Sequence, residues 1–205
     1  LGYYVGCIVV DGSLFVPQSR PRLFVVATKV AKSRLLNLIS KKPDATWHPQ
    51  NLVKAQASLP DEMKKKWVWW SMPTPPEREK NLIDIIETNP TDVKELDKNE
   101  VGRLVSMMSD TNLEKLHKAK SEKKLVAGGL YKRVRKQKDG TKLQRAEIRF
   151  DGTAGCLRTP TGGSSRQTLV LVENNNVKAR LLSRREAARL MGVPESYKLP
   201  ERYND

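Results

Sequence analysis

The sequence predicts a mixed α/β protein whose strands and helices gather in different parts of the chain. Two runs of β-branched and aromatic residues, at positions 3–10 and 23–28, are typical of strands buried on both faces. Apolar residues spaced three and four apart between residues 78 and 121 predict amphipathic helices. From Gly128 onward apolar and polar residues alternate, which indicates antiparallel hairpins.

Composition narrows the class of protein. The 205 residues include 38 Lys and Arg against 23 Asp and Glu, a formal net charge of +15, and 38% are hydrophobic. That apolar fraction can bury a core, and no apolar run approaches the roughly 18–20 residues of a membrane span. Cys7 and Cys156 are too few for a disulfide framework. We expect a cytoplasmic protein without a membrane partner and, because it opens with Leu1, a part of a longer chain.

The positive charge is concentrated between residues 115 and 149, which hold 13 bases and 3 acids. A polyanion is the natural partner of such a segment, and phosphate binding of this kind depends on salt but not on sequence. The alternative for Lys115–Lys124 taken alone is a lysine-rich helix face in contact with solvent. The charge therefore predicts nucleic-acid binding without naming a site.

The first half of the chain begins with the two apolar runs. The polar, proline-containing loop between them predicts a strand, a loop and a returning strand within residues 1–29. A smaller, irregular region with all four tryptophans follows. These indoles either anchor a small core or stack on bases, and the core is the favoured interpretation.

Three helices are predicted after the tryptophans. Residues 78–87 form the first, and Val101, Leu104, Val105 and Met108 mark one face of the second. The third is expected to begin at Thr111, because Thr111 and Glu114 match a capping box.

Two hairpins and one more helix are predicted in the last third. Residues 130–136 and 142–150 flank Asp139-Gly140, a strong hairpin signal, and residues 167–172 and 177–182 flank three asparagines. A second capping box at Ser183 and Glu186 opens a helix that runs to Met191 and ends at Gly192. Candidates for contacts in a DNA groove are the basic residues of the first hairpin, namely Arg133, Arg135, Lys136, Arg145 and Arg149.

Three segments resemble motifs of the DNA (cytosine-5) methyltransferases, in the order that this family carries them. Gln18-Ser19-Arg20-Pro21-Arg22 resembles the Q-x-R-x-R element, motif VIII. Residues 151–167 are similar to motif IX of bacterial members, and residues 180–197 to the opening of motif X. The Trp-Trp-x-x-Pro-x-Pro-Pro pattern at residues 69–76 also resembles bacterial members.

The resemblance implies the C-terminal portion of a Rossmann-like methyltransferase catalytic domain and a small mixed α+β target recognition domain. Residues 1–29 would belong to the catalytic domain, with motif VIII. Residues 30–172 would form the target recognition domain, including motif IX. Residues 173–205 would return to the catalytic domain with part of motif X.

The resemblance also implies a reaction. The family flips a cytosine out of duplex DNA, attacks C6 with a cysteine thiolate and transfers a methyl group from S-adenosylmethionine to C5. It gives Arg22 the role of donor to O2 of the flipped cytosine, with Arg20 and Gln18 organising the loop. Double-stranded DNA is the implied partner, in a bacterial cytoplasm and a restriction–modification setting.

The family's nucleophile lies in a Pro-Cys dipeptide, and no proline precedes Cys7 or Cys156. The family's Glu-Asn-Val motif and its glycine-rich cofactor loop also lack counterparts, and residues 151–155 predict only a turn. We therefore expect this chain alone to be inactive, with no cofactor-binding residue of its own and a catalytic N-terminal half as partner. The alternative is a stand-alone, non-catalytic nucleic-acid-binding module.

A glycine- and serine-rich loop is a candidate for gripping phosphate, because small residues admit a backbone closely. The alternative is a plain turn. His48, His117 and the two cysteines lack the spacing of metal ligands, so no metal site is expected. The predicted DNA-binding residues of the loop are Arg158, Thr159, Gly162, Gly163, Ser164, Ser165, Arg166 and Gln167.

Overall fold

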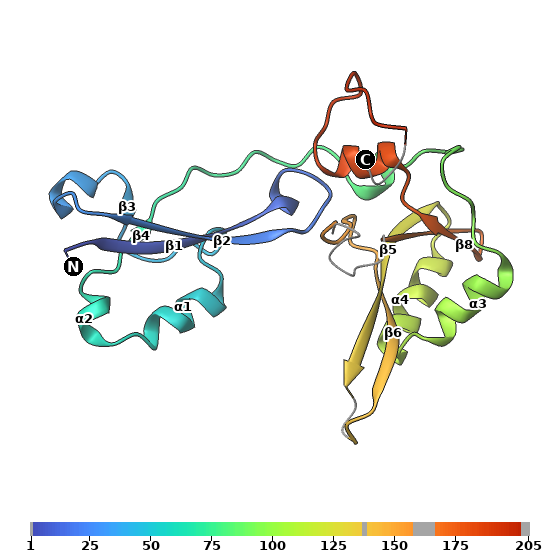
Figure 1. Cartoon of the computed structure of the whole chain (residues 1–205), viewed down its shortest axis with the longest axis horizontal. Helices are drawn as coiled ribbons and strands as arrows, with labels where there is room; N and C mark the ends of the chain where they lie inside the picture. The colour runs from blue at the N-terminus through green and yellow to red at the C-terminus, as the bar shows by residue number, and fades with distance from the viewer. Residues whose placement is uncertain (1, 137–138, 158–166, 202–205) are drawn as a thin grey trace. The chain divides into compact units, whose positions relative to one another are not determined.

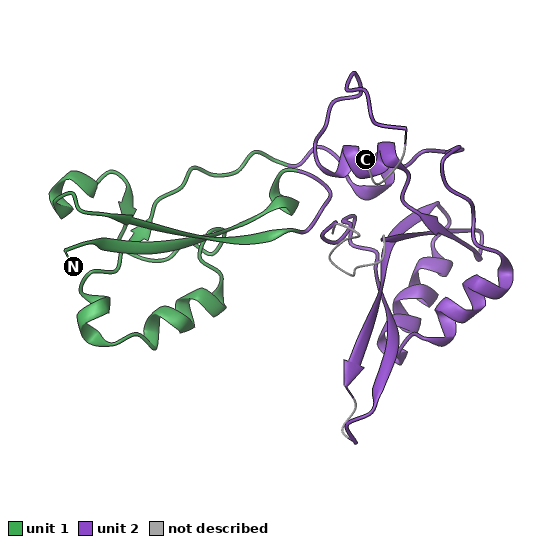
Figure 2. Cartoon of the chain, viewed as in Figure 1, with its two compact units in different colours: residues 1–15, 20–77 green, residues 16–19, 78–205 purple. Residues whose placement is uncertain are grey.

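The computed structural model describes residues 2–136, 139–157 and 167–201. The chain is mixed α/β and forms two compact units (Figures 1 and 2). Unit 1 comprises Leu1–Phe15 and Arg20–Glu77, and unit 2 comprises Val16–Ser19 and Arg78–Asp205. The tip of the first loop, residues 16–19, therefore belongs to the second unit.

Unit 1 opens with the predicted strand, loop and returning strand. Strand β1 (Tyr4–Asp11) pairs antiparallel with β2 (Pro21–Thr28) over the full length of both, from Tyr4 opposite Thr28 to Asp11 opposite Pro21. The Asp11 carboxylate accepts hydrogen bonds from the backbone N–H groups of Ser13 (3.0 Å) and Arg20 (2.7 Å). One side chain thus ties the start of the loop, including the 3-10 turn η1 (Gly12–Leu14), to its end.

The rest of unit 1 packs short elements around the tryptophans. These elements are η2 (Lys32–Leu35), β3 (Ile39–Ser40), α1 (Gln50–Ala57), α2 (Asp61–Lys64) and β4 (Trp69–Trp70), with β3 and β4 antiparallel. Trp47 and Trp70 are buried with Ile8, Leu35 and Val68, which confirms that they anchor a core.

The expectation that both strands are buried on both faces is wrong for β2. Its residues are exposed along nearly the whole strand, and Leu23, Phe24 and Val25 are 58%, 49% and 63% exposed. The physical reason is that the core of unit 1 packs against β1, through Tyr4, Ile8 and Val10, and includes no residue of β2. An apolar strand left open in this way is the usual mark of a surface that another segment covers.

Unit 2 is built on a four-stranded antiparallel sheet in the order β6-β5-β7-β8. The strands are β5 (Val126–Lys136), β6 (Lys142–Arg149), β7 (Thr168–Glu173) and β8 (Asn176–Leu181). Helices α3 (Lys98–Ser106) and α4 (Asp110–Ser121) pack on one face around Leu104, Leu116 and Leu130. The β5–β6 hairpin continues past these helices (Figure 1).

A second core covers the opposite face of the same sheet. Leu169 and Ala127 pack there against Leu82 and Ile85, and against Leu190 of helix α5 (Arg184–Leu190). The sheet of unit 2 thus lies between two layers, with α3 and α4 on one side and the turn η3 (Leu82–Ile85) with α5 on the other.

Two of the predicted helical features are wrong. Residues 78–87 contain only the 3-10 turn η3, because their backbone groups bond other segments: Leu82 N–H donates to Gly152 O (2.8 Å) and Glu87 N–H to the Glu186 carboxylate (2.8 Å). Helix α4 begins at Asp110 rather than at a Thr111 capping box. In the first turn of α4, the Asn112 side chain accepts a hydrogen bond from the Ile148 N–H (3.0 Å) and so ties the helix to β6.

The turns and the last helix are confirmed. Asn174 and Asn175 have φ of 48° and 64°, so they form the tight turn between β7 and β8, and Gly140 (φ 87°) lies in the first hairpin turn. Ser183 and Glu186 make the predicted capping box of α5. Helix α3 includes the predicted apolar face, with Leu104 buried.

Candidate nucleic-acid interface

Gln18 is buried in unit 2 and ties three segments together. Its Nε2 donates to the carbonyl of Leu190 at the end of α5 (2.9 Å), and its Oε1 accepts from the Leu157 N–H (3.3 Å). The backbone beside it forms a bridge to Ala154: the Ser19 N–H donates to Ala154 O (2.8 Å) and the Ala154 N–H to Pro17 O (2.7 Å). The loop tip is therefore held in a defined conformation by unit 2.

Arg20 and Arg22 follow this tip and belong to unit 1. The Arg20 backbone is fixed by Asp11. Arg22 lies exposed on β2 opposite Val10, and its guanidinium donates to the carbonyl of the preceding Pro21 (2.8 Å). A guanidinium on an exposed strand can present several donors to a ligand.

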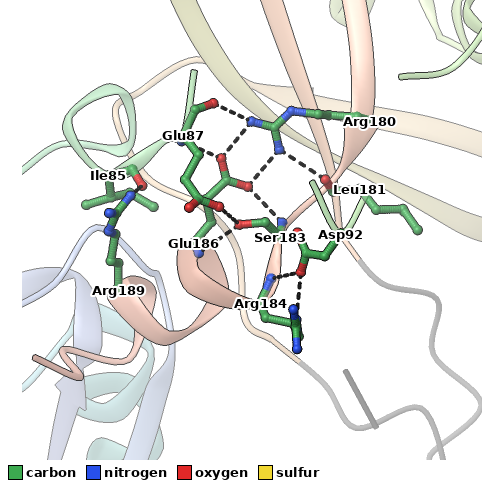
Figure 3. A network of polar contacts seen from close by, with 9 residues as sticks. All are labelled: Ile85, Glu87, Asp92, Arg180, Leu181, Ser183, Arg184, Glu186 and Arg189. Carbon is green, nitrogen blue, oxygen red and sulfur yellow. Dashed lines mark hydrogen bonds and ion pairs between the residues drawn. The ribbon is translucent and has the colours of Figure 1, made fainter. Parts of the chain in front are cut away.

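Helix α5, on which Gln18 depends, is anchored by a buried ion pair (Figure 3). Arg180 and Glu186 are 3% and 0% exposed, and the guanidinium donates two bonds of 2.7 Å to the two carboxylate oxygens. Glu186 also accepts from the backbone N–H groups of Ser183 and Glu87, and Arg180 donates to the Glu87 carbonyl (3.0 Å). Nearby, the Arg184 guanidinium donates to the Asp92 carboxylate (3.0 Å). Burial raises the pKa of Asp92, but the hydrogen bonds from Arg184 outweigh this effect and lower the pKa below its ordinary value.

The junction between Gln18 and the basic hairpin is tightly packed. A methyl group on Gly155 would lie 1.4 Å from Tyr131 Oη, and one on Gly129 would lie 2.1 Å from Gln167 Nε2. Tyr131 Oη donates to Gln167 Oε1 (3.0 Å). Gln167, predicted to bind DNA, is only 4% exposed. Its side chain thus holds the start of β7 against β5.

The β5–β6 register places three predicted DNA contacts on one face. Tyr131 lies opposite Glu147, Arg133 opposite Arg145, and Arg135 opposite Leu143. Since side chains alternate along a strand, Arg133, Arg135 and Arg145 share the face that carries Tyr131. Lys136 projects from the other face.

Glu147 binds two of these arginines. The Arg135 Nε donates to Glu147 Oε1 (2.7 Å) and one Nη of the same guanidinium contacts the same oxygen, while the Arg133 Nε lies 3.4 Å from Glu147 Oε2. The Arg133 guanidinium also lies over the Tyr131 ring, 5.7 Å from its centroid. Sequence reasoning missed Glu147 and Tyr131, although the Asp139-Gly140 turn fixes a register that puts both beside the arginines.

Arg149, the remaining candidate of the hairpin, is held at its base. Its Nε donates to both oxygens of Asp151 (2.9 and 3.0 Å). Burial raises the pKa of that carboxyl, but the hydrogen bonds from Arg149 and Thr153 outweigh it and lower the pKa below its ordinary value. Arg149 thus stabilises the turn that follows β6.

Most of the glycine- and serine-rich loop lies outside the described residues, including Arg158, Thr159, Gly162, Gly163, Ser164, Ser165 and Arg166. The residues that flank it in the chain are described. Leu157 bonds Gln18, and Gln167 bonds Tyr131. Of these two flanking residues, Leu157 is thus held by the first loop and Gln167 by the hairpin.

A cavity of about 660 Å³ lies between α4, the start of β5 and residues 149–152. Lys115, Lys118 and Lys124 are on its wall, together with Phe150. The three lysines are exposed, which fits both phosphate binding and a helix face in contact with solvent.

The two cysteines and the glycine-rich turn do not fit a methyl-transfer centre. Burial raises the pKa of the Cys7 thiol, which disfavours the thiolate, and Cys156 Sγ lies 3.3 Å from the Leu157 carbonyl. The side chains of Tyr131 and Asn81 lie close beside Gly155 and Gly152, so a methyl group on either glycine would meet them.

Among the residues that the structure describes, no group of three or more His, Cys, Asp or Glu side chains is placed to hold a metal ion. Within the same ranges, no helix is both long and apolar enough to span a membrane.

Comparison with known proteins gives one result. A family model for the C-5 cytosine-specific DNA methylase matches residues 1–204. No curated protein and no solved structure shows significant similarity to the chain.

Proposed function

Because the chain belongs to the C-5 cytosine-specific DNA methylase family, we propose that it is the part of a DNA (cytosine-5) methyltransferase that holds and reads duplex DNA. The observation that carries this proposal is the face of the β5–β6 hairpin on which Arg133, Arg135 and Arg145 lie together. A two-stranded ribbon fits the major groove, and arginine forks bind guanine edges there.

The contacts of Gln18 also favour the arginine face of the hairpin as the DNA-binding surface. Through Leu157, Ala154 and Tyr131, the loop tip connects to the face that carries the arginines. Arg20 and Arg22 follow this loop tip in the chain. In the complete enzyme Arg22 donates to O2 of a cytosine flipped out of the duplex, the role that the family motif implies.

The nucleophile and the pocket for S-adenosylmethionine come from a catalytic part outside the printed sequence. In the printed sequence neither cysteine follows a proline, and the turn at residues 151–155 packs closely against the side chains of Asn81 and Tyr131. The exposed apolar side chains of β2 supply a surface for that part. This exposure favours a piece of an enzyme over a module that stands alone.

The test of DNA reading is selection of random duplex DNA by the chain at about 50 mM and 200 mM salt. We expect one short cytosine-containing site to be enriched at both, with affinity that falls steeply as salt rises. Enrichment of no site, or equal binding to a neutral polymer, would refute the proposal.

Matched variants test which face binds. Arg145→Ala and Lys136→Ala remove the same charge from opposite faces of the hairpin. We expect Arg145→Ala to relax the selected sequence and Lys136→Ala to weaken binding without changing it. The reverse pattern would assign the interface to the other face.

The surface for the catalytic part has a separate test. Val25→Asp places a charge on β2, three residues along the strand from Arg22. It should abolish methyl transfer when the chain is combined with the catalytic part, while duplex binding by the chain stays unchanged. Normal assembly and activity of the Val25→Asp variant would refute the role of β2.

A further inference from the structure

The arginine face of the hairpin carries an electrostatic cost. Arg133 and Arg145 lie directly opposite each other on paired strands, and like charges at such positions are destabilising. Arg135 adds a third positive charge two residues along β5. Only Glu147 supplies a carboxylate to this face among the described residues of the two strands.

Glu147 compensates these charges in a particular way. It lies between two arginines that are 50% and 54% exposed at the side chain, while its own side chain is 28% exposed. Its oxygens bond the Nε edge of Arg135 and approach the Nε of Arg133. An arginine held by Nε and one Nη still has donors at its outer end, which form the fork that binds guanine O6 and N7.

Resting on the function proposed above, we propose that Glu147 is a specificity-determining residue that aims Arg133 and Arg135 at base edges. Its negative charge at the same time opposes binding of the two guanidinium groups to phosphate, which carries no sequence information. Side chains fixed before binding lose less freedom when they bind, so the aimed forks discriminate better.

The spacing of the two arginines sets the expected pattern. Residues two apart on a strand are separated by about 6.7 Å, and base pairs in a duplex stack at about 3.4 Å. Arg133 and Arg135 can therefore reach guanines two base-pair steps apart. Each lies over a different base pair, and Glu147 supports both.

The experiment uses the full chain and a pool of duplexes with a randomised centre. We compare the wild-type chain with Glu147→Gln, Arg133→Lys and Arg135→Lys. Lysine keeps the charge and loses the fork. Each arginine variant should lose guanine preference at one position, and Glu147→Gln should lose it at both. For Glu147→Gln, the ratio of specific to non-specific affinity should fall by at least the roughly 5- to 150-fold of one bidentate contact, with equal or tighter non-specific binding.

Glu114→Gln is the matched control. Glu114 is exposed on α4 of the same unit, and its replacement changes the net charge equally. We expect it to tighten all binding slightly and to leave the selected site unchanged. Melting temperatures close to wild type would show that the variants are folded.

The outcomes separate this inference from the proposed function. If Glu147→Gln keeps the wild-type site and ratio, or if Glu114→Gln lowers the ratio as much, Glu147 has no special role and DNA reading still stands. If the wild-type chain enriches no sequence, both the role of Glu147 and the proposed reading of DNA are overturned.

Discussion

Glu186→Gln should destabilise unit 2 selectively and strongly. The wild-type carboxylate accepts four hydrogen bonds, two from Arg180 and one each from the backbone of Ser183 and Glu87, and is fully buried. The amide places N–H groups against some of these donors and leaves the Arg180 charge without a counter-ion. Removing one partner of a buried ion pair costs roughly 3–5 kcal/mol.

The assay can separate the two units. All four tryptophans lie between residues 47 and 70, in unit 1, so tryptophan fluorescence follows that unit alone. Circular dichroism follows the helices and sheet of both. We expect the dichroism transition of unit 2 to move down by on the order of 10 °C or more, while the fluorescence transition stays in place.

Two controls sharpen the result. Glu195→Gln removes an exposed partner of Arg189, and exposed ion pairs contribute little to stability because water and salt screen them. Removing both charges, in Arg180→Met with Glu186→Gln, should cost less than Glu186→Gln alone because no charge is left unpaired. A loss from Glu186→Gln no larger than that from Glu195→Gln would refute the reasoning.

Three other predictions concern different parts of the chain. Burial lowers the pKa of His48 below 6.5, and the charge of Asp44 opposes this only in part. The Asp44 backbone N–H donates to Nδ1 of the ring (2.9 Å), a bond that only the neutral ring accepts there. Unit 1 should therefore lose stability as pH falls below about 6.5, where the unfolded chain binds a proton that the folded unit does not, and urea titrations followed by fluorescence should show no such dependence in His48→Gln. Gly155→Ala should displace Tyr131, whose Oη would lie 1.4 Å from the new methyl group, and cost roughly 1–3 kcal/mol; an unchanged urea midpoint would contradict the packing. Arg22→Ala in the complete enzyme should cut methyl transfer far more than duplex binding, and equal losses in the two assays would count against a role at the flipped base.

Local patterns were sufficient for the elements that depend on neighbouring residues. The hairpin around Asp139-Gly140, the asparagine turn and the Ser183–Glu186 capping box all formed as predicted. Their stability comes from contacts within a few residues or across one turn, so periodicity and turn chemistry specify them.

The incorrect predictions share a cause. Residues 78–87 have helical spacing, but Gly152 and Glu186 take up their backbone groups, so only η3 forms. The apolar composition of β2 predicts burial, yet its exposure depends on whether other segments pack on the faces of its sheet, and the core of unit 1 packs against β1 instead. Both outcomes depend on partners far away in the sequence.

The features of the candidate site also fall into those that the sequence predicts and those that depend on tertiary packing. The sequence by itself determined the strand–loop–strand, the basic hairpin and the methylase family to which the chain belongs. Only the tertiary structure decided that Gln167 is buried, that Gln18 is held by α5, and that Glu147 binds Arg133 and Arg135. The physical reason is that residue type and alternation fix which face a side chain takes, whereas its burial and its partners depend on segments brought together by packing.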